Sequence, residues 1–288
     1  MAVSLDELNR ASPAQFVAAL GGIFEHSPWV AEAVVGKRPF ATLAALHQAM
    51  ADAVRAVDDA RKLALLRQHP DLAGKAARAG VMTADSVSEQ GSAGLHRLSE
   101  QEFDRLGALN SAYMSKFGFP FIVCVRRHTK DSIFRQFETR LNNDTAAEYG
   151  AALTEIFRIS ALRLDQHVVA PERLKVAGLM DVHVIDIMRG VAATGLSVEL
   201  RELSASGAEQ RVTSGTVDAT GVSKLIDGRP IPIGQYELRF AVGDYFGGDP
   251  AARFLDVVPV RFAIAEPEGQ YHIPLRITPW TYTVYRGQ

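Results

Sequence analysis

The sequence contains a single cysteine, Cys124, which lies in the apolar segment FIVCV. One cysteine excludes an internal disulfide and a cysteine metal cluster, and it is typical of proteins in a reducing compartment. No apolar run approaches the ~20 residues that are needed to span a bilayer. The first residues, MAVSLDELNRASPAQF, also lack the basic and apolar regions of a signal peptide. We therefore expect a cytoplasmic protein without a membrane span.

An excess of charge of one sign is also missing. The chain has 31 Lys and Arg residues against 33 Asp and Glu residues. This balance provides no basic surface for nucleic acid or for an anionic membrane, so we expect neither as a partner, and small-molecule chemistry is favoured. At 288 residues the chain exceeds the usual size of one hydrophobic core, which predicts two domains.

The first half of the chain has the hydrophobic period of α-helices. Up to about residue 164, apolar residues recur at intervals of three and four. Ser12 before Pro13, and Ser99 with Glu102 three residues later, have the spacing of helix N-caps. Helices are predicted near 12–24, 40–54, 58–68, 99–116, 130–141 and 145–164. We expect an all-α helical bundle over residues 1–164.

From residue 181 the period changes to two, which is typical of β-strands. The segments LSVELREL (196–203), YELRFAV (236–242) and VVPVRFAI (257–264) alternate in this way, with Gly, Asp and Pro turns between them. This pattern predicts an all-β antiparallel sandwich over 179–288, interrupted by a short helix near DPAARF (249–254). Residues 165–178 have the proline, glycine and charges of a linker.

His69 directly precedes Pro70 in the segment RQHPDLAG. Proline disfavours helical geometry in the residue before it, so the preceding helix should end at about Gln68 and His69 should lie at a junction. One interpretation is structural, with Pro70 and Asp71 in the first turn of the next helix. The other is that the imidazole moves a proton.

The segment SVSEQGSAGL also has two interpretations. Ser86 and Glu89 have the spacing of a capping box, which explains both without a ligand. Gln90 and the glycines Gly91 and Gly94 fit a helix start less well, because glycine weakens the helix that the cap would begin.

Arg163 is predicted to point into the bundle. It falls on one stripe of the last predicted helix, together with Tyr149, Leu153, Ile156 and Ser160. A buried arginine needs an anion, whereas an arginine in the last helical turn also interacts favourably with the helix C-terminus from solvent. The pattern leaves both alternatives open.

Four motifs in order contain these residues: HPDLAG, S-x-x-EQ-x-x-AGL, N-x-x-Y-x-x-KFGFPFI and I-x-x-LRL. Together they resemble the 2-oxo-4-hydroxy-4-carboxy-5-ureidoimidazoline (OHCU) decarboxylases of urate breakdown over residues 5–164. The resemblance implies an all-helical enzyme without a cofactor that releases carbon dioxide and gives one hand of allantoin. It implies His69 as the acid or base and Arg163 as the group that binds an anionic or carbonyl edge. The substrate is then held by Glu89 with Ser86 and Gln90, and the pocket floor is formed by Pro70 and by the backbone of Phe119 and Ile122.

Three basic side chains stand out in the second half. Alternation in DVHVIDI places His183 on one strand face with Ile185, and an inward histidine with a satisfied hydrogen bond is the structural interpretation. Arg229 lies in the turn DGRPIPIG, where an exposed arginine needs no functional explanation. His272, in YHIPLRITPW, shares a polar face with Arg276.

The segments HVID, DGR, PIGQYEL, YHIPL and the final YRG resemble the transthyretin-like 5-hydroxyisourate hydrolases over about 181–288. The resemblance implies a two-sheet sandwich that assembles as a tetramer, with sites where subunits meet. It implies the following roles: His183 and His272 activate water, Arg229 polarises the attacked carbonyl, and Tyr285 with Arg286 completes the pocket wall. No third histidine, cysteine or acid is evident at ligand spacing, so we expect no metal. Gln270 and Gln288 depart from the histidine and the terminal serine that are usual at these positions.

The two resemblances describe consecutive reactions, because the product of the hydrolase is the substrate of the decarboxylase. The sequence therefore predicts a bifunctional enzyme that converts 5-hydroxyisourate to OHCU and then to (S)-allantoin and carbon dioxide. We expect no cofactor, and a homotetramer through the sandwich with dimer contacts through the helical domain. In the alternative hypothesis only the helical half is an enzyme and the sandwich is a non-catalytic binding or assembly module. The joint presence of His183, Arg229 and His272 favours the first hypothesis, and Gln288 favours the second.

Overall fold

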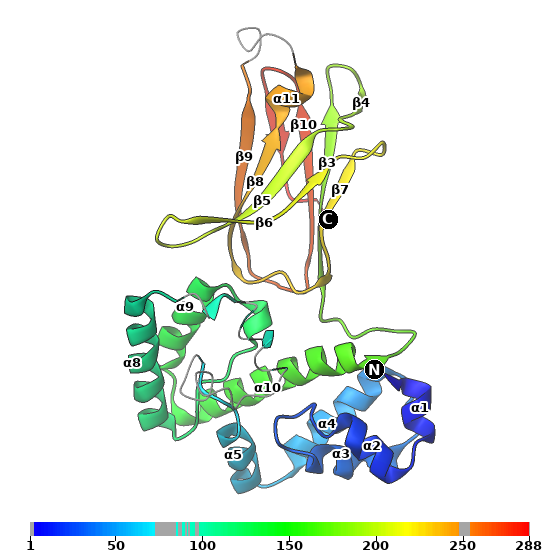
Figure 1. Ribbon diagram of the computed structural model, residues 1–288, viewed down its shortest axis with the longest axis vertical. Helices are drawn as coiled ribbons and strands as arrows, with labels where there is room; N and C mark the ends of the chain where they lie inside the picture. Colours follow the sequence, from blue (N-terminus) through cyan, green and yellow to red (C-terminus); the bar gives the residue numbers. More distant parts are fainter. Residues whose placement is uncertain are drawn as a thin grey trace. The chain divides into compact units, whose positions relative to one another are not determined.

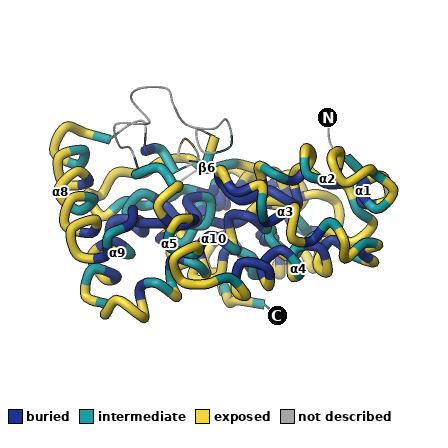
Figure 2. The backbone as a smooth tube through the Cα atoms, turned by 90° about the horizontal axis from the view of Figure 1, so that it is seen from below, coloured by how far each residue is buried: buried dark blue, intermediate teal, exposed yellow. Residues whose placement is uncertain are grey.

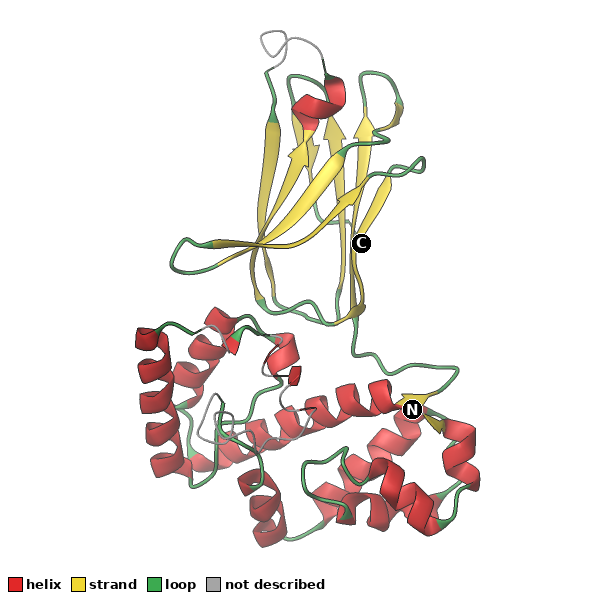
Figure 3. Cartoon of the chain, in the orientation of Figure 1, coloured by secondary structure: helices red, strands yellow, loops and turns green. Residues whose placement is uncertain are grey.

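The computed structural model describes residues 3–72, 85, 88–89, 91, 93–95, 98–247 and 254–287. The chain divides into two compact units, Met1–Lys175 and Val176–Gln288. Helices make up the first unit and strands dominate the second (Figures 1 and 3). The predicted change from an all-α half to an all-β half is therefore confirmed. None of the described helices is long and apolar enough to cross a membrane.

The helices of the first unit begin where the sequence provides capping side chains. Ser12 and Ser99 each form a capping box, with Gln15 and Glu102 respectively, as their spacing indicates. The described elements are β1 (Val3–Ser4), α1 (Leu5–Arg10), α2 (Pro13–Leu20), α3 (Trp29–Val34), η1 (Val35–Lys37), α4 (Leu43–Ala56), α5 (Asp59–Arg67), α8 (Glu100–Phe117), η3 (Val125–Arg127), α9 (Lys130–Arg140), α10 (Thr145–His167) and β2 (Val168–Val169). Among these described elements the shortest ones were not predicted. Helices α1 and α3 have six residues each and η1 and η3 three each, which is less than two turns of the hydrophobic period, and β1 and β2 have two residues each.

Helix α10 forms the central element of the helical unit (Figure 2), and Ile156 and Ile159 on it are buried. It packs against α4, where His47 Nε2 lies 3.0 Å from Ser160 Oγ. The segment after α10 stays attached to this unit. Strand β2 pairs in parallel with β1, and Arg173 binds the Asp165 carboxylate, with Nε donating to Oδ1 at 2.9 Å.

The second unit is a sandwich of two sheets. Its elements are β3 (Gly178–Asp186), β4 (Val191–Ala192), β5 (Ser197–Leu203), β6 (Glu209–Thr216), β7 (Val222–Arg229), β8 (Gly234–Ala241), α11 (Val242–Phe246), β9 (Val257–Ile264), β10 (Gln270–Ile277) and β11 (Tyr282–Val284). One sheet has the order β11-β10-β3-β4, with β7 also paired to β3, and the other has the order β6-β5-β8-β9. Pairing is antiparallel except between β10 and β3, which are parallel. The predicted helix at 249–254 lies outside the described residues except for Phe254.

Alternation along β3 separates the core from the opposite face of its sheet. Met180, Val182 and Val184 are fully buried between the sheets, while Asp181 and His183 are partly exposed on the other face. The inward side chains of β5 and β8 complete the core. An inward position for His183 is therefore wrong, because it alternates with the core residues.

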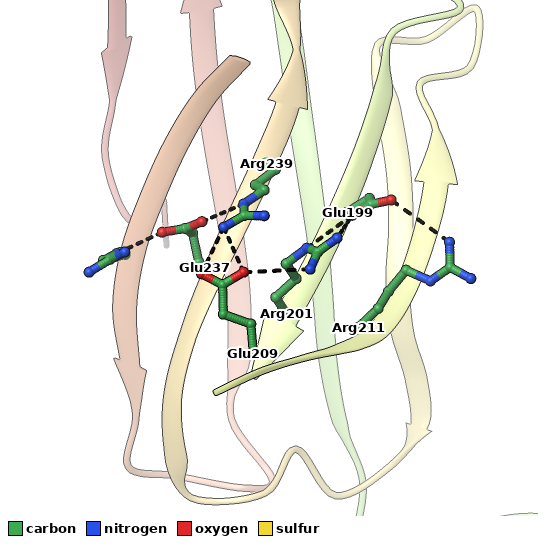
Figure 4. Close-up of polar contacts among 7 residues, drawn as sticks. Glu199, Arg201, Glu209, Arg211, Glu237 and Arg239 are labelled. Carbon is green, nitrogen blue, oxygen red and sulfur yellow. Dashed lines mark hydrogen bonds and ion pairs between the residues drawn. The ribbon is translucent and has the colours of Figure 1, made fainter. Parts of the chain in front are cut away.

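Charged side chains gather on the sheet formed by β5, β6, β8 and β9 (Figure 4). Glu237, whose side chain is 3% exposed, lies between Arg239 and Arg261, with 2.6 Å separating the paired atoms in both cases. Further pairs join Glu199 to Arg201 and Arg211, and Glu209 to Arg201 and Arg239. This sheet therefore has a polar face of paired charges, whereas both candidate histidines lie on the other sheet.

Candidate active sites

The helical unit contains a small, partly open pocket. The residues after α5, the segment before and in η3, and α10 contribute to its wall, together with Glu89. Its lining residues are His69, Pro70, Leu72, Glu89, Phe121, Ile122, Val123, Val125, Ile159 and Arg163. The structure thus brings His69, Glu89 and Arg163 to one cavity, although 94 residues separate the first from the last along the chain.

His69 lies at the junction after α5, which ends at Arg67 with Gln68 as its C-cap. The predicted helix end before Pro70 is confirmed. The ring Nε2 of His69 is buried and has no hydrogen-bond partner among the described residues. Burial lowers the pKa of His69 to about 4, and the positive charge of Arg163 adds to this decrease against the opposing effect of Glu25. The imidazole is therefore neutral at pH 7 and is able to accept a proton.

Arg163 is 2% exposed and is bound on two sides by carboxylates. Its Nε and Nη2 donate to the two oxygens of Glu89 at 2.9 and 3.0 Å, and its Nη1 lies 2.6 Å from Glu25 Oε2. Burial alone would lower the pKa of Arg163, but hydrogen bonds and attraction from Glu89 and Glu25 outweigh burial and raise it. The inward alternative for Arg163 is therefore confirmed, and the chain itself supplies counter-ions.

Sequence reasoning missed Glu25. This residue is 2% exposed and lies between α2 and α3, in the segment IFEHSP. The following residue, His26, has a φ of 48°, in the left-handed region that non-glycine residues rarely adopt. The sequence did contain a signal for Glu25, which is a carboxylate directly after the apolar residues Ile23 and Phe24. A carboxylate that is buried with such neighbours needs a charged or hydrogen-bonding partner.

A buried hydrogen-bond network holds the pocket floor from behind. Arg140 Nη1 donates to the carbonyl of Ile122 at 2.7 Å, and its Nε donates to Glu148 Oε1 at 2.9 Å. Tyr113, from the N-x-x-Y motif, also donates to Glu148 Oε1, and Asn143 Nδ2 donates to Oε2 at 2.8 Å. Ile122 lines the pocket as predicted, and its carbonyl is bound by Arg140, which shares the Glu148 carboxylate with two other donors.

The remaining predicted residues of this half differ in their placement. Pro70 lines the pocket. Phe119 is buried in an aromatic cluster, with its ring centroid 5.8 Å from that of Tyr113, and Phe121 rather than Phe119 is among the lining residues. Ser86 and Gln90 lie outside the described residues.

In the sandwich, strand pairing brings the two predicted histidines together. In the parallel register of β3 and β10, His272 is opposite Asp181, and Pro274 is opposite His183. The ring centroids of His183 and His272 are 6.1 Å apart. His272 Nδ1 is hydrogen-bonded to Asp181 Oδ1. The two imidazoles therefore share one sheet face, and Asp181 joins them as a residue that the sequence analysis missed.

Two glycines allow backbone to approach these rings. A Cβ on Gly221 would lie 2.8 Å from His183 Cδ2, and one on Gly287 would lie 2.5 Å from His272 Cδ2. Gly221 also has a φ of 86°, which other residues rarely adopt. Each imidazole is thus packed against a backbone segment that only glycine permits.

The segment after β11 continues along β10 to the histidine. Gly287 N donates to the carbonyl of His272 at 2.8 Å, and the Arg286 guanidinium lies 4.7 Å from the ring centroid of Tyr271. Tyr285 is 50% exposed. The backbone of 285–287 therefore runs beside His272, but the Arg286 side chain packs on Tyr271, which alternates with His272 along β10. Gln288 is outside the described residues.

Arg229 lies farther from the histidines. It ends β7 opposite Gly178, and it is exposed. His272 is opposite Asp181, three residues along β3, which corresponds to about 10 Å of strand. In the described part of the chain no hydrogen bond or ion pair joins Arg229 to either histidine. Across the same residues, no group of three or more His, Cys, Asp or Glu side chains is placed to hold a metal ion.

Comparison with known proteins gives each unit a family. The OHCU decarboxylase family model matches residues 9–165, and the HIUase/Transthyretin family model matches residues 180–287. The chain is 38% identical over 167 residues to the 2-oxo-4-hydroxy-4-carboxy-5-ureidoimidazoline decarboxylase of Halalkalicoccus jeotgali, covering 58% of this chain and 93% of that protein. It is 40% identical over 161 residues to the uric acid degradation bifunctional protein PucL of Bacillus subtilis, covering 56% of this chain but only 32% of that protein.

A solved structure matches the whole chain. The crystal structure of (S)-allantoin synthase is 30% identical in sequence, with a TM-score of 0.54, and the match covers 99% of this chain and 100% of that one. Both predicted resemblances are thereby confirmed. The chain belongs to the OHCU decarboxylase family through its helical unit and to the HIUase/Transthyretin family through its sandwich.

Proposed function

We propose that this chain catalyses two consecutive steps of urate breakdown, hydrolysis of 5-hydroxyisourate to OHCU and decarboxylation of OHCU to (S)-allantoin. The observation that supports it most directly is the convergence of a neutral His69, Glu89 and Arg163 on one pocket, together with a paired His183 and His272 on the sandwich. Two families in one chain, each with its own histidine site, fit two reactions.

Hydrolysis adds water across a ring amide of 5-hydroxyisourate. The oxygen of water bonds to the carbonyl carbon and the carbon–nitrogen bond breaks, so that the nitrogen gains one proton of the water and the new acid loses the other. The histidine pair provides ring nitrogens that accept and return these protons. We infer that Arg229 polarises the carbonyl only after its side chain turns toward the pair, because it ends β7 exposed and unconnected to either ring.

The steps of the decarboxylation can be derived from the functional groups of OHCU. The hydroxyl and carboxylate are both on C4, and C5 carries the ureido group and the adjacent imine. When the carboxylate leaves as carbon dioxide, its bonding electrons form a C4–C5 double bond, the carbon–nitrogen double bond of the imine becomes single, and its nitrogen takes a proton from water. The hydroxyl proton then leaves and C5 gains a proton, which gives allantoin. We assign both transfers to His69, because a neutral imidazole collects the hydroxyl proton and returns it to C5 from one side.

In the proposed decarboxylase site, the carboxylate of the substrate lies next to the buried guanidinium of Arg163. Arg163 is held by two carboxylates, so a substrate carboxylate competes with Glu89 and Glu25 for the guanidinium. We infer that Glu89 turns from Arg163 to the ureido N–H groups when the substrate binds. Such an exchange replaces one charged hydrogen bond by another and keeps both groups paired.

The experiment generates 5-hydroxyisourate from urate with urate oxidase and follows its ultraviolet decay and the appearance of optical activity. Wild type accelerates both steps. His272→Ala slows only the first step and His69→Ala slows only the second, while His167→Ala, with a 49% exposed side chain, serves as the imidazole control. A first step at the uncatalysed rate would favour the alternative of a non-catalytic sandwich.

We also propose that the sandwich assembles into a tetramer through its free strand edges. Strand β11 is one edge of the first sheet and β9 is one edge of the second, and Trp280 and Tyr282, before and in β11, are 58% and 40% exposed. An edge strand with exposed aromatic side chains is suited to pairing with a second copy. Sedimentation of wild type and Tyr282→Lys tests this, because a charge at that edge lowers the assembly state. The cytoplasmic location stays a prediction from cysteine usage.

A further inference from the structure

Asp181 and His272 form a carboxylate and imidazole pair that the two-histidine site does not require. They are opposite each other in the parallel pairing of β3 with β10, strands that lie side by side in Figure 1. The side chains are 18% and 35% exposed, so the carboxylate is the more shielded of the two. Alternation along β3 places Asp181 on the same sheet face as His183, outside the core, and the pairing with β10 places His272 on that face as well.

The hydrogen bond between them defines where the ring proton is. An ionised carboxylate only accepts hydrogen bonds, so His272 Nδ1 carries the hydrogen that it donates to Asp181 Oδ1. The neutral ring then has its lone pair on Nε2, which has no protein partner in the described ranges. Gly287 closes against Cδ2 on the other side of the ring, which limits its rotation.

The charged neighbours leave Asp181 available to the histidine. Lys224 is opposite Asp181 on β7, but its Nζ lies 3.7 Å from Asp227 Oδ2. Asp218, before β7, accepts hydrogen bonds from Thr220 N and Val222 N within its own turn. Within the described residues His272 is therefore the single hydrogen-bond partner of the Asp181 side chain. His183 interacts electrostatically with Asp218, and no hydrogen bond joins it to a carboxylate in the same residues.

We propose that Asp181 is a positioning residue for the hydrolysis, which holds His272 with its proton on Nδ1 so that Nε2 accepts a proton from water. The carboxylate also stabilises the imidazolium that this transfer forms. The two histidines then have different tasks. His272 is the base toward water, and His183 serves the ring nitrogen that the hydrolysis releases. This inference rests on the proposed hydrolase activity.

The test measures the tautomer and the kinetics of the full chain. In wild type, nitrogen-15 NMR of labelled histidine is expected to show His272 as the Nδ1–H tautomer. In Asp181→Asn we expect a shift toward Nε2–H, and a fall in kcat for 5-hydroxyisourate of at least ~10-fold with little change in KM. Asp181→Glu keeps the carboxylate and is expected to restore part of kcat.

Asp244→Asn is the matched control, because it removes an exposed carboxylate from α11 of the same unit, and it should leave kcat unchanged. Decarboxylation of OHCU by Asp181→Asn should equal that of wild type, which reports that the helical unit is folded. The dispersion of the resonances in the same NMR samples reports whether the sandwich is folded. An unchanged kcat in Asp181→Asn, or a lower kcat with an unchanged tautomer, would overturn the assignment. The Nε2–H tautomer in wild type would overturn it even if the variant fails to fold. A wild-type chain that does not accelerate 5-hydroxyisourate decay would instead refute the hydrolase function.

Discussion

The buried position of His69 makes a quantitative prediction for the pH dependence of decarboxylation. The pKa of His69 is lowered from 6.5 to about 4, chiefly by burial. At pH 5 a histidine with this pKa is about 90% neutral, whereas one with a pKa of 6.5 is about 3% neutral. The structure therefore predicts about 30 times more of the base form at pH 5 than an exposed histidine would provide.

We expect kcat/KM for decarboxylation to change less than about twofold between pH 7.5 and 5, because this quantity reports the ionisation of the free enzyme. The assay follows the optical activity of allantoin after OHCU is formed in situ by an excess of a separate hydrolase. Circular dichroism at each pH shows whether the protein stays folded. A rate that falls tenfold per pH unit from about pH 6.5 downward would refute a neutral, buried His69 as the base.

Three further results are expected. Arg163→Met leaves the carboxylates of Glu25 and Glu89 buried without their cation and should lower the free energy of unfolding by ~3–5 kcal/mol in urea titrations, part of which Glu25→Gln restores. Burial lowers the pKa of His128 to about 4, so the unfolded chain binds more protons between pH 4 and 6.5 and stability falls as pH falls through that window. His128→Gln should remove about 2 kcal/mol of the loss between pH 7.5 and 5, measured by urea unfolding at both values. Gly287→Ala should slow 5-hydroxyisourate hydrolysis roughly 100-fold without slowing decarboxylation, because its Cβ would displace the His272 ring, which we propose as the base. A hydrolysis rate equal to that of wild type in the coupled assay would contradict this.

The sequence predicted those features that depend on local periodicity. The stripe on α10 put Arg163 on the face that points inward, with a side chain reaching solvent as the open alternative, and the proline rule placed His69 after the end of α5. Alternation in β10 correctly put His272 on a face away from the buried Ile273. Each of these conclusions needs only a few neighbouring residues.

The partners of those residues could not be predicted in the same way. Glu25 reaches Arg163 from a loop 138 residues earlier, and Asp181 reaches His272 through a parallel pairing of strands 91 residues apart. Alternation defines the face of a strand but not its neighbour in the sheet. For His183, alternation alone left the choice between inside and outside, and only the observed core on Met180, Val182 and Val184 decided it.

In the candidate decarboxylase pocket, the residues that hold the backbone in place are different from the residues that line the cavity. Arg140 and Glu148 fix the Ile122 carbonyl from the far side of the backbone, and neither is among the lining residues. Side chains such as Val123 and Val125 thus project from a backbone that is anchored independently of them. Substitutions at these two valines should therefore change the size of the cavity without breaking the hydrogen bonds that hold its backbone. A library restricted to both positions is a way to make the pocket accept a bulkier imidazoline.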